Sequence, residues 1–207
     1  MVPIRSIGPR HGGRIVAHLL ALSPQDRYLR FGYAASDEQI QHYVAGINFE
    51  RDEVFGIYNR KLELIAMAHL AFSTDPLLQS CAEFGVSVLA HARGRGFGAR
   101  LFDRAVMHSR NEGVQMMFIH ALSENTAMLD IARKAGAKVE RDGSESEAYL
   151  KLQPADLDSR MTELFDEQIA QADYRLKLQA RQFWRFLNRA LGGRCVDKNS
   201  GESGEIK

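Results

Sequence analysis

The chain has 207 residues, of which 45% are hydrophobic and 26% charged, an ordinary composition for one globular domain with a core of its own. Its 27 lysines and arginines nearly balance 26 aspartates and glutamates, so the net charge gives no reason to expect nucleic acid as a partner. The cysteines, Cys81 and Cys195, have no paired spacing and indicate neither a disulfide framework nor a zinc site, and no metal is expected.

The first 72 residues predict a short strand, helical segments and an antiparallel hairpin. Residues 4–7 are suited to an edge strand, and residues 13–22 have helical apolar spacing. Ser23 is placed to cap a helix over 24–31, with proline at its first position. Ser36 with Gln39 forms a capping box before another helical segment. Residues 53–58 and 62–72 read as two strands joined at Asn59 and Arg60.

A glycine- and arginine-rich turn follows the next predicted strand and leads into a helix over 99–110. In the strand, Phe84, Val86 and Val88 alternate with Glu83, Gly85 and Ser87, as in a half-buried strand. The turn consists of Arg93, Gly94, Arg95, Gly96, Phe97 and Gly98. Glycines allow a ligand to approach the backbone closely, and the first N–H groups of a helix have no internal partner. With two guanidinium groups added, the turn predicts a site for the pyrophosphate of a cofactor.

Two other glycine-loop classes compete for this turn. A P-loop requires Lys-Ser/Thr after its last glycine, and Ala99 and Arg100 stand there instead, which excludes it. Gly94, Gly96 and Ala99 do satisfy the dinucleotide-binding pattern G-x-G-x-x-G/A. The dinucleotide-binding reading stays open but is disfavoured for two reasons. Glu83 makes the strand before the turn amphipathic, whereas dinucleotide-binding domains start from a fully apolar parallel strand. Antiparallel hairpins also precede this strand-turn-helix unit, whereas such a domain would begin with it.

The remaining elements alternate strands and helices. Gly113 is suited to end the helix, and residues 114–122 form a strongly apolar strand. A second helix starts around Asn125 and ends at Gly136. Residues 138–140 and 147–152 then predict a final strand pair around a polar turn over 141–144.

This order of elements, over roughly residues 3–152, resembles the GNAT N-acetyltransferase superfamily. Arg93, Gly96 and Gly98 match the family's acyl-CoA loop, Q/R-x-x-G-x-G/A, and Asn125 and Gly136 have the eleven-residue spacing of its second helix. Residues 27–44 also look similar to bacterial protein-lysine acetyltransferases of this superfamily. The resemblance implies an α+β (mixed α/β) fold in which helices flank a central, mostly antiparallel mixed sheet. It also implies that acyl-CoA binds where two parallel strands splay apart.

The resemblance further implies acetyl-CoA as the cosubstrate, with no metal, and an amine acceptor on a protein lysine or a small molecule. It puts the backbone of Val88 and Leu89 on the pantetheine arm and the Val88 N–H at the developing oxyanion. The pyrophosphate would bind to the turn, that is, to Arg93, Gly94, Arg95, Gly96, Phe97 and Gly98. Asn125 would either contact the cofactor or only cap its helix.

Glu83 is the candidate base for direct attack by the amine, since the family often has a glutamate there and an amine must lose a proton to react. A solvated or salt-bridged carboxylate is the other reading of Glu83. Many relatives carry a tyrosine that protonates the CoA thiolate, and Ala132 stands at that position. The alternative function is therefore a non-catalytic acyl-CoA-binding module whose C-terminal helix recruits a partner.

Three segments are expected: a catalytic domain over 1–153, a long amphipathic helix over 154–192 and a disordered tail over 193–207. The helix has an acidic first half and a basic second half. Its apolar stripe predicts a homodimer or a partner protein, and antiparallel pairing would match the halves. The stripe comprises Met161, Phe165, Ile169, Ala172, Leu176, Ala180, Phe183 and Leu187. The N-terminus lacks a signal-peptide core and no run has membrane-spanning length, so a cytoplasmic protein is expected and a membrane partner is disfavoured.

Overall fold

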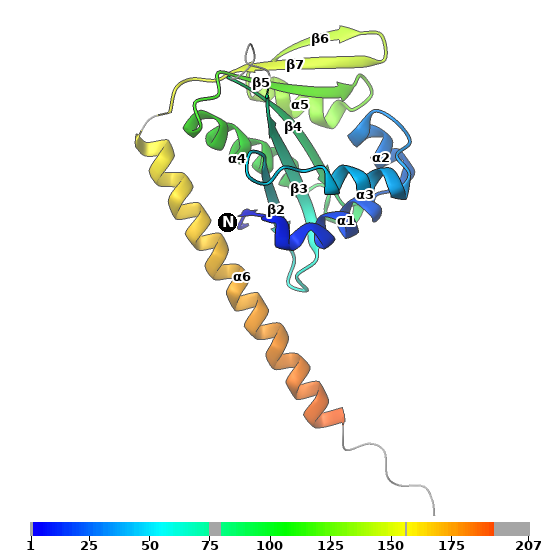
Figure 1. Cartoon of the computed structure of the whole chain (residues 1–207), viewed down its shortest axis with the longest axis vertical. Coiled ribbons are helices and arrows are strands. Elements are labelled where there is room, and N and C mark those ends of the chain that lie inside the picture. The colour runs from blue at the N-terminus through cyan, green and yellow to red at the C-terminus, as the bar shows by residue number, and fades with distance from the viewer. Residues whose placement is uncertain (1, 75–79, 156, 193–207) are drawn as a thin grey trace, which may run out of the picture.

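A mixed sheet flanked by helices organises the chain in this computed structural model, which describes residues 2–74, 80–155 and 157–192 (Figure 1). Within these residues the sheet has seven strands in the order β1-β2-β3-β4-β5-β7-β6. The strands are β1 (Arg5–Ser6), β2 (Glu53–Tyr58), β3 (Leu64–Phe72), β4 (Cys81–Val88), β5 (Met116–Leu122), β6 (Lys138–Asp142) and β7 (Glu145–Lys151). Every neighbouring pair is antiparallel except β4 and β5, which run parallel. The expected mixed α/β fold with a mostly antiparallel sheet is confirmed.

Helices cover both faces of this sheet. The α-helices are α1 (Gly12–Leu20), α2 (Pro24–Phe31), α3 (Asp37–Ala45), α4 (Phe97–Asn111), α5 (Thr126–Lys134) and α6 (Leu157–Gly192). On one face, the ring of Phe84 on β4 packs edge-on against Phe102 of α4, with centroids 5.1 Å apart. On the other face, His18 of α1 bonds to Ser87 of β4, and α2 and α3 lie beside α1. Apolar side chains on both faces of β3 are therefore buried, and the core has two layers.

The helix starts follow the predicted capping residues. The Ser23 hydroxyl accepts the Asp26 N–H before α2, and Ser36 with Gln39 completes a capping box before α3. These local side-chain-to-backbone bonds satisfy N–H groups that the helices cannot pair internally. They fix where α2 and α3 begin, and both helices border the cavities described below.

Two turns differ from their predicted extent. The Asn59 side-chain oxygen accepts the N–H groups of Lys61 and Glu63, which lengthens the β2–β3 turn so that β3 begins at Leu64 rather than Leu62. Leu62 lies inside this turn with a φ of 60°. The β6–β7 turn is shorter than expected, because both strands pair up to the end of the hairpin. Neither change alters the order of the elements.

Helix α6 docks its first half on the domain and continues past it (Figure 1). Ala170 and Tyr174 are buried on the docked side. Glu163 accepts a hydrogen bond from His108 of α4 at 2.7 Å; burial opposes the charged imidazole, but Glu163 prevails and raises the pKa of His108. The predicted tail over 193–207 lies outside the described residues. No helix in the described part of the chain combines the length and apolarity needed to cross a membrane.

Candidate active site

Two cavities meet on the side of the sheet where α2 and α5 approach β4 and β5. The first, of about 360 Å³, lies beside the glycine turn, and the second, of about 410 Å³, lies between α2, α3, β4 and β5. Residues that line both cavities are Leu29, Arg30, Val86, Asn125 and Met128. The two spaces are therefore contiguous, which suits a site where one molecule passes a group to another. We refer to them as the turn cavity and the strand cavity.

The cavities exist because β4 and β5 diverge. The two strands pair only from Cys81 to Glu83, opposite residues 116–118, after which β5 pairs with β7 alone. On the other side, β4 stays paired with β3 up to Val88. The second half of β4 thus has a free edge that faces into the gap.

The backbone of Val88 is directed into this gap. Bonds from the Leu89 N–H to the Ile65 carbonyl and from the Ser73 N–H to the Cys81 carbonyl, both 3.0 Å, show that the odd-numbered residues of β4 pair with β3. Alternate residues of an antiparallel ladder direct their N–H and C=O groups to opposite sides. The groups of Val88 consequently point away from β3. Leu89 is buried, its N–H is already used, and it is not among the residues that line either cavity.

The glycine turn lies at the end of the turn cavity. Gly94 and Gly96 have φ angles of 73° and 72°, which L-residues with side chains rarely adopt. Gly96 is the N-cap of α4, and no side chain caps the helix there. A Cβ atom at either glycine would meet no atom within 4 Å, so the backbone faces open space. Gly94, Gly96, Phe97 and Gly98 all line the turn cavity.

The two arginines of the turn have different surroundings. Arg93 lines the turn cavity, forms an ion pair with Asp26 of α2 and donates through Nε to the Val88 carbonyl at 3.3 Å. Burial opposes ionisation of Asp26, but hydrogen bonds from Ser23 and Arg93 outweigh it and lower the pKa of Asp26. Arg95 instead lies over the Phe97 ring, 4.7 Å from its centroid, and lines neither cavity. Arg93 therefore ties the turn to α2 across the cavity.

Asn125 caps α5 and also borders both cavities. Its side-chain oxygen accepts the Met128 N–H at 3.2 Å, and its amide donates to the Leu29 carbonyl of α2 at 3.4 Å. Capping is thus realised, and the position next to both cavities is compatible with a cofactor contact as well. Ala132, on the same helix, is fully buried and brings no hydroxyl to the site.

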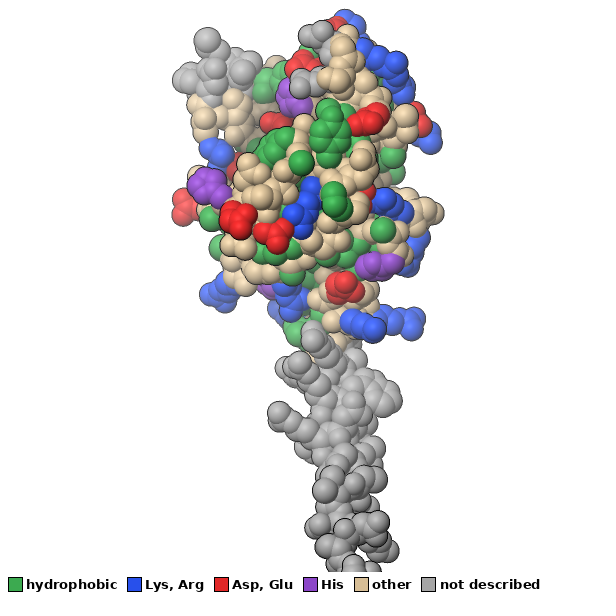
Figure 2. All heavy atoms as spheres, turned by 90° about the vertical axis from the view of Figure 1, so that its right-hand side faces the viewer, with side chains coloured by type: hydrophobic (Ala, Val, Ile, Leu, Met, Phe, Trp, Pro, Cys, Tyr) green, Lys and Arg blue, Asp and Glu red, His purple; other side chains and the backbone are tan. Residues whose placement is uncertain are grey.

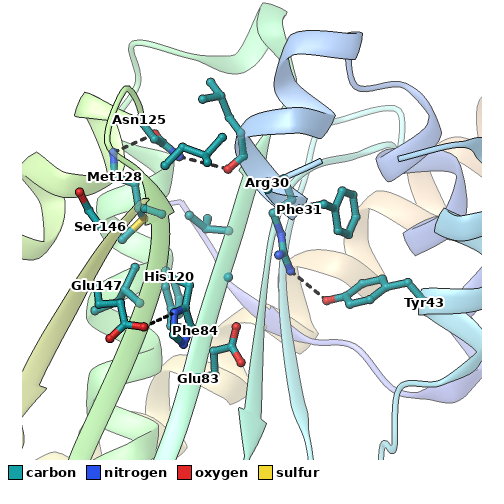
Figure 3. Close-up of a pocket in the computed structure, with 17 residues that line it drawn as sticks. Arg30, Phe31, Tyr43, Glu83, Phe84, His120, Asn125, Met128, Ser146 and Glu147 are labelled. Atoms are coloured by element: carbon teal, nitrogen blue, oxygen red, sulfur yellow. Dashed lines mark hydrogen bonds and ion pairs between the residues drawn. The ribbon is translucent and has the colours of Figure 1, made fainter. Parts of the chain in front are cut away.

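Charged side chains surround the strand cavity (Figure 3). Glu83 has an exposed side chain on β4. His120 of β5 and Glu147 of β7 form an ion pair at 3.5 Å across from Arg30 of α2. The Arg30 guanidinium lies against Gly85, where any Cβ would come within 2.7 Å of it. Within the described residues, no carboxylate forms an ion pair with Arg30.

A partly buried polar network, which sequence reasoning missed, adjoins the strand cavity. Arg30 donates to the Tyr43 hydroxyl at 2.9 Å, and that hydroxyl lies 2.7 Å from His69 Nδ1. His69 Nε2 lies 3.4 Å from a carboxylate oxygen of Asp52, which is 5% exposed. These residues come from α2, α3, β3 and the segment before β2, so no short motif could have connected them.

The face on the side of α2 and α3 carries mixed charge. Figure 2, which views the molecule from that side, shows acidic and basic side chains interspersed rather than gathered into one patch of a single sign. Recognition on this face thus depends on the cavities and their local groups.

The chain matches the family model described as acetyltransferase (GNAT) family over residues 11–137. The fold is similar to the GNAT domain of S. lividans PAT, with a TM-score of 0.61 and 19% identity over 72% of this chain and 89% of that one. It is also similar to an N-acetyltransferase from Staphylococcus aureus Mu50, with a TM-score of 0.58 and 15% identity over 74% and 99% of the two chains.

A ribosomal-protein-alanine N-acetyltransferase from Brucella melitensis has a TM-score of 0.55 and 15% identity over 72% of this chain and 99% of its own. At these identities the likeness to solved structures shows the fold. A search of curated proteins found no match. The family match covers more than half of the 207 residues, and the predicted resemblance is confirmed: the chain belongs to the GNAT acetyltransferase family.

Proposed function

We propose that the protein is an N-acetyltransferase that transfers an acetyl group from acetyl-CoA to an amine by direct attack. The observation that carries this proposal is the divergence of β4 from β5 between two contiguous cavities. One cavity ends at an uncapped helix start formed by glycines, which suits a phosphate-bearing cosubstrate. The other has carboxylates at its border, which suits a cationic amine.

Acetyl-CoA would bind with its pyrophosphate at Gly94, Gly96 and Gly98 and its pantetheine arm along the free edge of β4. Backbone N–H groups at the start of α4 would donate to the phosphates, and the helix dipole favours negative charge there. Arg93 adds positive charge beside the phosphates, but it is paired with Asp26. Its contribution to phosphate binding would therefore be greatest if that ion pair opened. Leu89 could reach the pantetheine only through its carbonyl, since its N–H is bonded to Ile65.

The thioester would then lie where the cavities join, beside Val86, Arg30 and Asn125. The Val88 N–H points into the gap and would stabilise the oxyanion that forms when the amine attacks. A backbone donor of this kind needs no reorganisation during the reaction, because the β3–β4 ladder already fixes its direction.

Glu83 would act as the base that converts an ammonium group into a nucleophilic amine. It lines the strand cavity, its side chain is exposed, and it lies on the strand that carries the oxyanion donor. Together with Glu147, which also lines the strand cavity, it would make this cavity attractive to a cation. Both a protein lysine and a small-molecule amine meet this description.

The experiment that tests the proposal mixes the full-length protein with acetyl-CoA and a panel of amines, and measures release of free CoA thiol. The panel contains small primary amines and lysine-containing peptides. Binding is measured separately by calorimetry with coenzyme A. Thiol release that depends on an amine supports the transferase. Binding without release supports the alternative, a non-catalytic acyl-CoA-binding module, and no binding contradicts both.

We also propose that α6 pairs with a second copy of the chain through its exposed apolar stripe. Met161, Leu164, Phe165 and Ile169 are 51–62% exposed, so the domain leaves this side of the helix uncovered. The expected antiparallel matching of charged halves gains little from Glu163 and Glu167, which pair with His108 and Arg104 of the same chain. Apolar contact would therefore carry the association. Stripe positions 176, 180, 183 and 187 have side chains outside the described set.

A further inference from the structure

The partly buried network that includes Tyr43 has a direction of proton donation set by Arg30 at one end and Asp52 at the other. A guanidinium can only donate, so the Tyr43 oxygen accepts a hydrogen bond from Arg30 at 2.9 Å. The phenol proton is then available to His69 Nδ1, 2.7 Å away, which must be unprotonated to receive it. The remaining proton of a neutral His69 lies on Nε2 and is directed toward Asp52 at 3.4 Å. The donating guanidinium of Arg30 and the accepting carboxylate of Asp52 together set these directions.

The charges around His69 keep it ready to accept a proton. Burial lowers the pKa of His69, and the positive charge of Arg30 lowers it further, while Asp52 and Glu83 act in the opposite direction. The imidazole is therefore neutral in the resting protein. The Asp52 carboxylate, to which Arg51 also donates at 2.8 and 3.2 Å, is in place beside the imidazolium that protonation would create. Tyr43 itself lines the strand cavity, as Glu83 and Gly85 do, and so faces the space proposed for the amine.

Acetylation of an ammonium group requires two protons to leave the nitrogen. The ammonium carries three N–H bonds and the product amide carries one, so a single carboxylate such as Glu83 accounts for only one of the two. The second proton leaves after the N–C bond has begun to form, when the nitrogen bears positive charge. A second acceptor in the strand cavity would take this proton before the CoA thiolate has left.

We propose that Tyr43, His69 and Asp52 form the proton relay that accepts this second proton. As the amine nitrogen bonds to the thioester carbon, its proton moves to the Tyr43 oxygen and the phenol proton moves to His69 Nδ1. The C–S bond breaks with its electron pair on sulfur, and the CoA thiolate takes a proton from solvent. The imidazolium is held beside Asp52 and returns its proton through Tyr43 once the product has left. Tyr43 touches the substrate, whereas His69 and Asp52 act through it.

This proposal rests on the proposed acetyltransferase function. It assigns a role in proton transfer to residues that lie outside the glycine turn. Arg30 contributes in a second way, because it has no carboxylate partner within the described residues and faces both cavities. Once the carboxylates have attracted an ammonium group, this positive charge favours its loss of a proton to give the neutral amine, which is the form that attacks. The same charge opposes the imidazolium, which explains why a buried carboxylate at Asp52 is needed.

The test uses full-length protein, acetyl-CoA and an amine that the wild-type protein acetylates. Tyr43→Phe and His69→Gln should each lower kcat by about 100-fold or more, with the Kd for acetyl-CoA unchanged. The double variant should be no slower than either single variant, because the residues act as one unit. The limb of the kcat–pH profile set by His69 should disappear in His69→Gln. Tyr33→Phe and His42→Gln, exposed outside the cavities, are matched controls and should retain wild-type kcat.

A kcat within about threefold of wild type in Tyr43→Phe, or losses that multiply in the double variant, would overturn the relay while leaving the acetyltransferase intact. If the wild-type protein binds acetyl-CoA but acetylates no amine, the proposed function fails and the relay with it. Should the variants not fold, nitrogen NMR of wild-type His69 decides. A neutral ring with its proton on Nε2 supports the relay, and a proton on Nδ1 in the resting protein contradicts it.

Discussion

The imidazole of His18 bonds to the hydroxyl of Ser87 through Nε2 at 2.8 Å, and this pair joins α1 to the strand that carries the site. The other ring nitrogen lies 2.8 Å from the Leu64 carbonyl. A carbonyl can only accept, so the proton of the neutral ring is on Nδ1, and Ser87 donates to Nε2. Because His18 is 2% exposed, burial lowers its pKa to about 4, and the charge of Arg30 acts in the same direction.

This buried histidine should make the protein less stable in mild acid. The unfolded chain binds a proton at His18 below about pH 6.5, whereas the folded chain does so only near pH 4, so stability falls as the pH drops between these values. Between pH 7.5 and 5 the loss from His18 should be about 2 kcal/mol of unfolding free energy. Urea unfolding at both pH values measures it.

His18→Gln is the comparison that isolates this contribution. Glutamine can still donate to Leu64 or accept from Ser87 but does not titrate, so the variant should lose less stability than wild type on going from pH 7.5 to 5. The other histidines are the same in both proteins, which removes their contributions from the difference. Equal losses in the two proteins would show that His18 is protonated at the same pH whether folded or unfolded.

Gly96→Glu should abolish binding of coenzyme A. The added side chain would place bulk and negative charge where the open backbone of the turn faces the turn cavity. The positive φ of 72° adds strain of about 1 kcal/mol for any residue with a Cβ. Calorimetry with coenzyme A measures the effect.

Gly113→Glu provides a control for strain and for charge. Gly113 has a φ of 79°, and a Cβ there would also meet no atom within 4 Å, but it lies at the opposite end of α4. The Gly113→Glu variant should retain wild-type affinity for coenzyme A while losing about as much folding stability as Gly96→Glu. Loss of binding in both variants would indicate that global strain, and not the turn, is responsible.

Glu83→Gln should lower kcat for amine acetylation by about 100-fold while leaving the Kd for acetyl-CoA unchanged. Glutamine keeps the size of the side chain but cannot accept a proton, and Glu83 lines only the cavity proposed for the amine. Initial rates from pH 6 to 9 measure the change. Glu38→Gln, on the exposed side of α3, is the matched control. A wild-type rate for Glu83→Gln at every pH would remove Glu83 as the base.

The glycine turn and the capped helices could be predicted because their signals are local. Ser36 with Gln39 forms a capping box within four residues, and positive φ angles require glycine or a close substitute. The strand leading into the turn could be read from its alternation. What alternation could not show is that Glu83 faces an open cavity, since that depends on β5 diverging after residue 118.

The relay residues could not be predicted, because their contacts are not local in the sequence. Tyr43 and His69 are 26 positions apart and Asp52 precedes a strand, so their contact depends on how α3 packs over β3. In the sequence, His69 is only the polar partner in an alternating strand, and Tyr43 is part of an apolar helix pattern. Likewise, the ion pair between Arg93 and Asp26 joins segments 67 residues apart and could not be anticipated from the turn alone.

Phe165→Glu should convert a dimer into a monomer. The Phe165 side chain is 60% exposed in the first half of the apolar stripe, and a carboxylate there could not be buried against a second copy without a large desolvation cost. Light scattering after gel filtration, at several protein concentrations, measures the mass. Tyr33→Glu, which changes an aromatic side chain 48% exposed elsewhere on the surface, should leave the mass unchanged. A wild-type protein that stays monomeric at every concentration would show that the stripe does not pair with its own copy.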